Sequence, residues 1–313
     1  MISSLQSPLE DGLPVIDISH FPKEIEGDRL QYHPEVVKLG KACEEWGIFR
    51  LVNHGVPQDL RQKVLSVSQD LLSMPMELKD SVTTSSPGRS YSHTPGVPIT
   101  FESFCLVDMP NPDSILELSR KIWPDEGNSN FCEAIGAFSL LLSDLAQRIT
   151  KLVLVSLGLD AEAFYHSDFE KCTAWLRING FSSQGKSIGE EGLIAHADRG
   201  WLTILHNDEE EGLEVLSKEG KWVNVKPSQN SLIVNLGISL KAWTNGRYRC
   251  AVHRVICKGW EKRLSVPLFY SFARDAHVLA PEVLVSEDNP RRYKPFTFND
   301  LQSEELRKEL EES

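Results

Sequence analysis

The chain has 313 residues, which suits a large single domain or a barrel preceded by a helical region. Its composition, with 41% hydrophobic and 25% charged residues, is ordinary for a globular protein. The formal net charge of -12 argues against a nucleic-acid partner, because binding to phosphate backbones requires a basic surface.

The N-terminus and the cysteines favour a cytoplasmic location. Residues 1–13 are predicted to form a loose tail. They lack the charged region and the apolar run of a signal peptide. The sequence has no run of about 18 apolar residues, so we expect no contact with a membrane. The six cysteines form no CxxC pair, so neither a zinc ribbon nor a disulfide scaffold is indicated, and we expect reduced thiols.

The first half of the chain is predicted to be mostly helical. Short strands are expected at 14–18 and 47–52, the second followed by a turn that contains His54. Apolar residues at helical spacing predict helices at 34–45, 58–73 and 131–157. The third of these helices is long enough to support a sheet along its whole length. Residues 81–100 are rich in Ser, Thr, Pro and Gly and are predicted to form a loop.

Beyond Thr173 the pattern changes to short, alternating segments bounded by turn residues, which is typical of a β-sandwich or barrel. Thr244-Asn245-Gly246-Arg247 is a strong signal for a hairpin between two of these strands. The charged C-terminal residues 303–312 are expected to form a solvated helix. The predicted strands cover residues 175–181, 200–207, 213–215, 222–225, 231–236, 248–256 and 264–272.

A candidate metal site is the motif His196-Ala197-Asp198 together with His253. Residues i and i+2 of a strand point to the same side, so His196 and Asp198 would present an imidazole and a carboxylate together. A second histidine from a neighbouring strand would complete three ligands on one face of a metal. Two histidines and one carboxylate leave open positions and suit iron(II) enzymes that activate oxygen.

A candidate anion clamp follows in Arg263-Leu264-Ser265. Arg263 and Ser265 share a strand face, so a guanidinium and a hydroxyl lie side by side. Such a pair can bind a carboxylate through two hydrogen bonds. The order and spacing of this pair relative to the HxD motif and the distal histidine are specific in combination.

These motifs resemble the plant 2-oxoglutarate/Fe(II)-dependent dioxygenases that share an isopenicillin-N-synthase-like barrel. The similarity runs from residue 14 to about residue 295 and includes residues 46–57, 202–205, 212–215, 234–237 and 244–246. The resemblance implies an all-β core with flanking helices, namely a double-stranded β-helix (jelly roll) with an α/β N-terminal region. We expect an N-terminal, mostly helical region at 1–160, the jelly-roll core at 170–285 and a C-terminal helical segment at 286–313.

The resemblance also implies roles for individual residues. Iron(II) would be bound by His196, Asp198 and His253, and the cosubstrate 2-oxoglutarate by Arg263, Ser265 and Asn179. Ascorbate would support activity, and dioxygen and a small-molecule substrate would be the partners. His54 belongs to a structural turn and is not expected to be a ligand. The expected substrate pocket consists of Phe269, Phe101, Phe104, Tyr91, Trp123, Arg177, Arg199 and Trp201. Arg89 and Lys121 are further basic residues that could meet an acidic substrate.

Within the family, residues 101–109 and 290–295 resemble the dioxygenases for auxin oxidation, which oxidise indole-3-acetic acid. Three positions depart from the family pattern. Phe181 replaces a tyrosine whose hydroxyl helps to hold 2-oxoglutarate, Ala197 replaces threonine between two ligands, and Arg199 replaces proline after the Asp ligand. The expected substrate is a small, largely apolar plant metabolite, and an acidic aromatic such as indole-3-acetic acid is the first candidate.

Other hypotheses about the function are compatible with the sequence. An alkaloid or a phenolic compound would be an alternative substrate for a hydroxylase or desaturase of the same class. A 2-oxoglutarate-independent oxidase on the same scaffold, or a jelly-roll binding protein without activity, would also fit the barrel. A zinc hydrolase is disfavoured, because no acidic residue is placed as a general base within the HxD motif.

Overall fold

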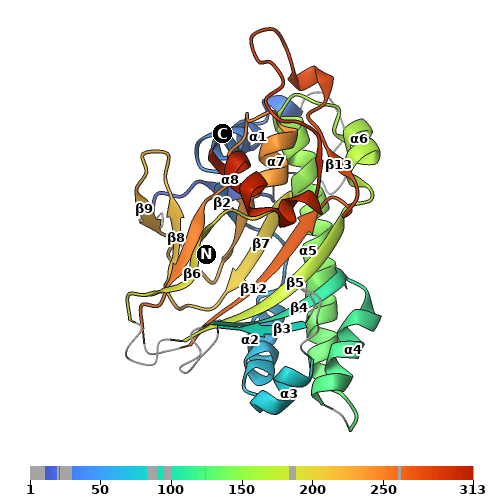
Figure 1. The fold of residues 1–313 in the computed structure, drawn as a ribbon, viewed down its shortest axis with the longest axis vertical. Coiled ribbons are helices and arrows are strands. Elements are labelled where there is room, and N and C mark those ends of the chain that lie inside the picture. The colour runs from blue at the N-terminus through green and yellow to red at the C-terminus, as the bar shows by residue number, and fades with distance from the viewer. Residues whose placement is uncertain are drawn as a thin grey trace, which may run out of the picture.

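The computed structural model describes residues 11–19, 21, 30–82, 90–94, 101–123, 125–182, 188–259 and 262–312. These residues form a core of β-strands with helices packed around it (Figure 1). The α-helices are α1 (Pro34–Glu45), α2 (Gln58–Leu72), α3 (Met76–Ser81), α4 (Pro112–Ile122), α5 (Ser129–Ser156), α6 (Ala161–Phe164), α7 (Ile238–Trp243) and α8 (Glu304–Glu312). Shorter helical turns are η1 (Leu30–Tyr32), η2 (Tyr165–Phe169), η3 (Glu282–Leu284) and η4 (Asp300–Gln302).

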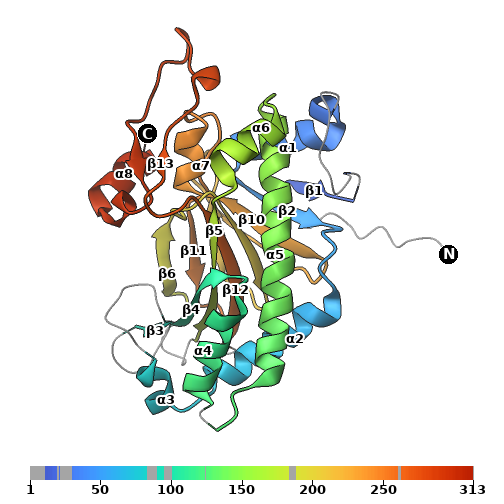
Figure 2. The same cartoon turned by 90° about the vertical axis from the view of Figure 1, so that its right-hand side faces the viewer.

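Two sheets make up the core. The large sheet has the strand order β1-β2-β10-β7-β12-β5-β4-β3, and the small sheet has the order β6-β11-β8-β9. The small sheet lies on one side of the large sheet, and α5 lies on the other (Figure 2). The strands are β1 (Val15–Asp17), β2 (Ile48–Val52), β3 (Ser90–His93), β4 (Phe101–Met109), β5 (Thr173–Phe181), β6 (Glu191–His196), β7 (Leu202–Asn207), β8 (Leu213–Leu216), β9 (Trp222–Asn224), β10 (Ser231–Leu236), β11 (His253–Ile256), β12 (Arg263–Ser271), β13 (His277–Val278) and β14 (Phe296–Thr297).

The long helix α5 supports the large sheet, as the sequence predicts. It begins after Asn128, whose side chain accepts a hydrogen bond of 3.0 Å from the backbone N–H of Phe131 and so caps the helix. The apolar face of this helix includes Ile135, Phe138 and Leu142, which are fully buried. Burying this stripe against the sheet leaves the opposite face of the sheet free to line a site.

Strand β5 shows how the two faces of the large sheet differ. Side chains alternate along a strand, so Arg177, Asn179 and Phe181 share one face and Leu176 and Ile178 share the other. Leu176 and Ile178 are fully buried in the hydrophobic core. The opposite face, which carries Arg177, is turned away from this core. It is called the inward face below.

Strand β12 extends the inward face next to β5. The two strands are antiparallel, with Arg263 opposite Phe181 and Ser265 opposite Asn179. The register therefore places the predicted anion clamp beside the predicted asparagine, on the face that is not committed to the hydrophobic core. Cross-strand neighbours of this kind lie within contact distance of each other.

The prediction of a hairpin at residues 244–247 is wrong. Helix α7 ends at Trp243, and the next strand, β11, begins only at His253. Asn245 (φ 52°) and Gly246 (φ 78°) adopt the left-handed conformation that commonly ends a helix. The Asn245 side chain also donates to the carbonyl of Pro290 at 3.2 Å. The turn signal was correct, but it marks a helix end that anchors a distant loop.

Other parts of the chain also differ from the sequence prediction. Residues 90–93 of the predicted loop form strand β3, and two elements that the pattern did not reveal, β4 and α4, follow it. The C-terminal helix α8 is not fully solvated, since Leu310 is only 4% exposed. None of the described helices is long and apolar enough to cross a membrane.

Candidate active site

Two histidines and an aspartate meet where the small sheet adjoins the large one. His196 ends β6, His253 begins the neighbouring strand β11, and the two residues are paired across the strands. Oδ1 of Asp198 lies 3.8 Å from Nε2 of His196 and 3.9 Å from Nε2 of His253. The ligand atoms of the three residues all lie within 4.8 Å of one another, so one metal ion can reach all of them.

Hydrogen bonds to the backbone orient both imidazoles. Nδ1 of His196 lies 2.8 Å from the carbonyl oxygen of Ile194, and Nδ1 of His253 lies 2.9 Å from that of Ala251. A carbonyl can only accept, so Nδ1 carries the proton and Nε2 keeps its lone pair for a metal. Desolvation and the neighbouring His253 lower the pKa of His196 to about 4, which keeps this ring neutral at physiological pH.

The carboxylate of Asp198 is oriented in a similar way. Thr203 on β7 donates a hydrogen bond of 2.6 Å to Oδ2, which leaves Oδ1 directed at the two histidines. Asp198 and Thr203 are both buried, at 6% and 2% exposed. Two imidazole nitrogens and one carboxylate oxygen are the donor set that suits iron(II) in oxygen-activating enzymes.

The turn between β6 and β7 differs in one respect from the prediction. Strand β6 ends at His196, so Asp198 lies in the turn rather than on the strand. The turn packs closely on Gly237, where a Cβ atom would lie 2.1 Å from the carbonyl oxygen of Gly200 and 2.8 Å from that of Asp198. Only glycine fits there, and this close contact fixes the backbone of the turn that carries Asp198.

The predicted anion clamp lies on the inward face, with its guanidinium free. Arg263 is 5% exposed, its Nε has no hydrogen-bond partner, and no hydrogen bond of its guanidinium occurs within the part of the chain that the structure describes. Burial lowers the pKa of Arg263, an effect opposed by the negative charge of Asp208. A buried guanidinium without partners is costly, and a ligand carboxylate would satisfy it.

The polar neighbours of the clamp form a connected set. Nδ2 of Asn179 lies 3.5 Å from the hydroxyl oxygen of Ser265, at the limit of a hydrogen bond. The hydroxyl of Ser103 on β4 donates to Oδ1 of Asn179 at 2.7 Å. The amide of Asn179 is thereby oriented between two hydroxyls, so the expected cosubstrate residues Arg263, Ser265 and Asn179 lie together.

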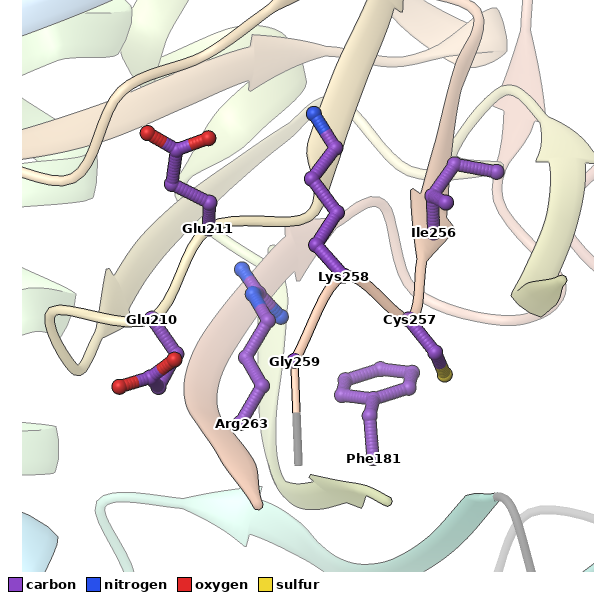
Figure 3. A pocket seen from close by; sticks show the side chains of 8 residues that line it. All are labelled: Phe181, Glu210, Glu211, Ile256, Cys257, Lys258, Gly259 and Arg263. Carbon is purple, nitrogen blue, oxygen red and sulfur yellow. The ribbon is translucent and has the colours of Figure 1, made fainter. Parts of the chain in front are cut away.

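A pocket opens at the guanidinium of Arg263 (Figure 3). Acidic and basic side chains surround the pocket, and the ring of Phe181 forms part of its wall. Its lining residues are Phe181, Glu210, Glu211, Ile256, Cys257, Lys258, Gly259 and Arg263.

Phe181 takes the place of the family's tyrosine in this wall. Its ring lies 5.4 Å from the guanidinium of Arg263 and 5.1 Å from the ring of Phe101. The side chain is 2% exposed. Phe181 therefore offers Arg263 a cation–π contact but no hydroxyl for a bound carboxylate.

Four of the eight residues expected in the substrate pocket lie on the inward face or beside the metal-ligand candidates. Phe101 is opposite Phe181 on the neighbouring strand, and Phe269 shares the inward face of β12 with Arg263. Arg177 lies on the inward face of β5, with Nη1 3.5 Å from the hydroxyl oxygen of Ser103. Arg199 directly follows Asp198.

The other four lie elsewhere. Tyr91 and Phe104 pack against each other on the opposite face of the large sheet, where the Tyr91 hydroxyl donates to Glu102 at 2.9 Å. Trp123 packs on Phe131 at the end of α4. Trp201 is fully buried in the hydrophobic core, 4.3 Å from the ring of Phe169.

The two additional basic residues do not join the site either. Lys121 is exposed on α4 and pairs with Glu117 at 2.6 Å. Arg89 lies outside the described residues.

Four residues near the site were not expected from the sequence. Thr203 supports Asp198, Trp175 stacks on Phe269, Phe298 contacts Trp175, and Arg307 lies on α8. Trp175 could have been found, because it precedes Arg177 by two residues on the same strand. The other three reach the site only through tertiary packing.

Comparison with known proteins agrees with this geometry. Residues 13–126 match the model of the non-haem dioxygenase in morphine synthesis N-terminal domain, and residues 166–272 match that of the 2OG-Fe(II) oxygenase superfamily. A probable 2-oxoglutarate-dependent dioxygenase of Arabidopsis thaliana, AOP1.2, is 30% identical to this chain, with coverage of 92% of this chain and 89% of the relative.

Two solved structures are similar over most of their length. The dioxygenase for auxin oxidation of rice has a TM-score of 0.79 and 30% identity, covering 95% of each chain. The complex of dioxygenase for auxin oxidation 1 from Arabidopsis thaliana with 2-oxoglutarate has a TM-score of 0.78 and 28% identity, covering 89% of this chain and all of that one.

The chain therefore belongs to the 2OG-Fe(II) oxygenase superfamily. It is a 2-oxoglutarate-dependent dioxygenase with a jelly-roll core, and its cofactors are iron(II) and 2-oxoglutarate. The predicted family, fold class, enzyme class and these two cofactors are confirmed. The role of ascorbate, the domain boundaries and the cytoplasmic location stay predictions.

Proposed function

We propose that this dioxygenase oxidises a small, largely apolar plant metabolite, with iron(II) bound by His196, Asp198 and His253. The single observation that carries the assignment of the iron site is that the donor atoms of these three residues all lie within 4.8 Å of one another. Iron(II) supplies the activation of dioxygen, coupled to conversion of 2-oxoglutarate to succinate and carbon dioxide.

The protein's own groups hold the three ligand side chains in position. The Ile194 and Ala251 carbonyls keep both histidines in the tautomer with a free Nε2, and Thr203 fixes the carboxylate of Asp198. Such supporting hydrogen bonds maintain the ligand geometry before the metal binds.

On the cosubstrate side, we assign the distal carboxylate of 2-oxoglutarate to Arg263 and Ser265, with Asn179 beside them. Support comes from the buried, unpartnered guanidinium on the same face of the sheet. The rings of Phe181 and Phe101 pack on each other beside this guanidinium, and an apolar environment of this kind strengthens a charged hydrogen bond.

The first substrate to test is an acidic aromatic such as indole-3-acetic acid. The inward face carries aromatic rings beside arginines, and two of the similar structures are dioxygenases for auxin oxidation. An alkaloid or a phenolic compound is the alternative within the same class, because residues outside the shared metal site decide the substrate.

The test is to incubate the protein with iron(II), ascorbate, 2-oxoglutarate and indole-3-acetate. We expect succinate and an oxidised indole in equal amounts, measured by mass spectrometry. Succinate without an oxidised indole would reject this substrate and direct the search to alkaloids and phenolics. An oxidised product without succinate would contradict the use of 2-oxoglutarate and favour the oxidase alternative.

A further inference from the structure

Three arginines from distant parts of the chain lie near the metal-ligand candidates, and the charges of Arg307 and Arg177 both act on Arg199. Arg177 lies on the inward face of β5, Arg199 follows Asp198, and Arg307 lies on α8. Nη1 of Arg199 lies 3.2 Å from the side-chain oxygen of Gln302, and Nη1 of Arg307 lies 3.0 Å from the carbonyl oxygen of the same residue. Two of the three guanidiniums thus meet at η4.

These cations lack acidic partners. Within the described ranges, Arg177, Arg199 and Arg307 form no ion pair with a carboxylate. Two glutamates of α8 have other partners. Glu304 pairs with Lys308 at 2.7 Å, and Glu311 accepts a backbone hydrogen bond of 3.4 Å from Ala197.

The electrostatic consequence appears at Arg199. Burial first, and then the positive charges of Arg307 and Arg177, lower the pKa of its guanidinium. Since an arginine keeps its proton, the cluster holds like charges together, although the charge of Arg307 also acts on Glu304 of the same helix. An anion bound between them would relieve both the repulsion and the desolvation.

An aromatic wall borders the same region. The rings of Trp175 and Phe269 are stacked, with centroids 5.2 Å apart and planes 6° from parallel. The ring of Phe298 lies 5.5 Å from that of Trp175. Trp175 shares its strand face with Arg177, and Phe298 precedes η4 by two residues, so the aromatic wall adjoins the arginine cluster.

The helix that carries Arg307 is firmly attached. Nζ of Lys241 on α7 donates to the carbonyl oxygens of Leu310 at 2.8 Å and Glu311 at 3.0 Å, which satisfies the C-terminal end of α8. The side chain of Leu310 is buried in the core. Figure 2 shows α8 beside α7 at the end of the barrel. Arg307 is therefore held at a defined position.

We propose that Arg177, Arg199 and Arg307 bind the carboxylate of the substrate, whose apolar body lies against Trp175 and Phe269. This inference rests on the proposed function and names the substrate class as carboxylic acids with an aromatic or similarly flat apolar group. It also makes the C-terminal helix part of the substrate site. Arginine suits this task, because its planar fork matches a carboxylate.

The experiment measures binding rather than turnover. The protein is loaded with iron(II) and 2-oxoglutarate under nitrogen and titrated calorimetrically with indole-3-acetate, phenylacetate, benzoate and the methyl ester of indole-3-acetate. We expect at least one acid to bind, and indole-3-acetate to bind more tightly than its ester. Arg307→Gln should weaken binding of the acid by about tenfold or more, since hydrogen bonds to charged groups are among the strong ones.

A matched control is Lys308→Gln on the same helix. It removes the same charge one residue away, but its side chain is 65% exposed and pairs with Glu304. We expect unchanged binding of both acid and ester. Equal loss of acid and ester affinity in Arg307→Gln would indicate a structural effect on α8 and overturn the proposal.

Measurements on the wild-type protein distinguish failure of the anion site from failure of the proposed function. If it converts 2-oxoglutarate to succinate but binds none of the three acids, the anion site is wrong and the enzyme assignment stands. If no succinate forms under air with any substrate, the proposed function fails as well. Acid binding without succinate would retain the anion site alone.

Discussion

Replacing Arg263 tests the cosubstrate site most directly. Its guanidinium is 5% exposed, and Nε has no partner among the described residues. A hydrogen bond to a charged group contributes about 1.5–3 kcal/mol, and each 1.4 kcal/mol is a factor of about ten. Arg263→Ala should therefore raise the KM for 2-oxoglutarate by roughly 10- to 150-fold.

The lysine variant refines this expectation. Arg263→Lys keeps the positive charge but cannot form two parallel hydrogen bonds with a carboxylate. We expect the KM of this variant to lie between those of the wild type and the alanine variant. The assay is succinate formation as a function of 2-oxoglutarate concentration, with the iron content measured for each preparation.

Loss of a buried arginine can also destabilise the fold, so a control is needed. Burial raises the pKa of Asp208 to about 6, and the positive charge of Arg263 opposes this effect. Removing Arg263 therefore takes a stabilising positive charge away from the buried carboxylate of Asp208. Arg61→Ala removes another buried arginine, which is 6% exposed and donates to the Gln229 carbonyl away from the inward face.

The control should lower the melting temperature and leave the KM for 2-oxoglutarate unchanged. If Arg263→Ala behaved like Arg61→Ala, with reduced stability and an unaltered KM, the assigned role of Arg263 would be refuted. An unchanged KM in a fully folded Arg263→Ala protein would be equally decisive.

Two further substitutions test neighbouring groups. Phe181→Tyr should restore a hydroxyl near the cosubstrate and lower the KM for 2-oxoglutarate by about 2- to 10-fold, the equivalent of one hydrogen bond. A raised KM in this variant would show that the buried ring has no room for the hydroxyl. Thr203→Val removes the donor to Asp198 and should weaken iron(II) affinity by about 10- to 100-fold in a metal titration without cosubstrate. An unchanged affinity would show that Asp198 needs no such support.

The metal and cosubstrate candidates could be predicted because they depend on short-range patterns. Arg263 and Ser265 are two residues apart on β12, so their relative directions follow from strand geometry. Asp198 lies in the turn after β6, so the sequence predicts only that it is close to His196. The structure brings His253 to them by pairing it with His196. Their ligand roles stay proposals that the substitutions above can test.

The pocket was harder to predict, because the face of a residue depends on knowing which element contains it. Phe101 and Phe104 were both expected in the pocket. Residues 101–109 form a strand, and positions three apart on a strand face opposite sides. Phe101 therefore lies on the inward face, whereas Phe104 is buried in the core.

Long-range docking was not visible in the sequence at all. Arg307 lies in a charged segment that resembles any solvated helix. Its position follows from Leu310, which is buried, and from Lys241, which binds the end of the helix. Such contacts join residues about seventy positions apart in the chain and leave no periodic signal.

Buried histidines lead to a prediction about stability in acid. His206 on β7 is 5% exposed, and its Nε2 lies 3.1 Å from the carbonyl oxygen of Arg61. Burial lowers the pKa of His206 from 6.5 to about 4, and the charge of Arg61 adds to this effect. Burial and Arg61 also lower the pKa of His54 to about 4.

A histidine whose pKa is lower in the folded state is protonated first in the unfolded chain. Its stabilising effect is complete above the unfolded pKa of 6.5 and declines as the pH falls toward about 4. For His206, the difference corresponds to about 2 kcal/mol between about pH 7.5 and about pH 5. We expect the free energy of unfolding, measured in urea, to fall by at least that amount. His206→Gln keeps a donor for the Arg61 carbonyl but cannot titrate, so its loss of stability over the same interval should be smaller by about 2 kcal/mol. An identical loss in the variant and the wild type would show that His206 does not control acid stability.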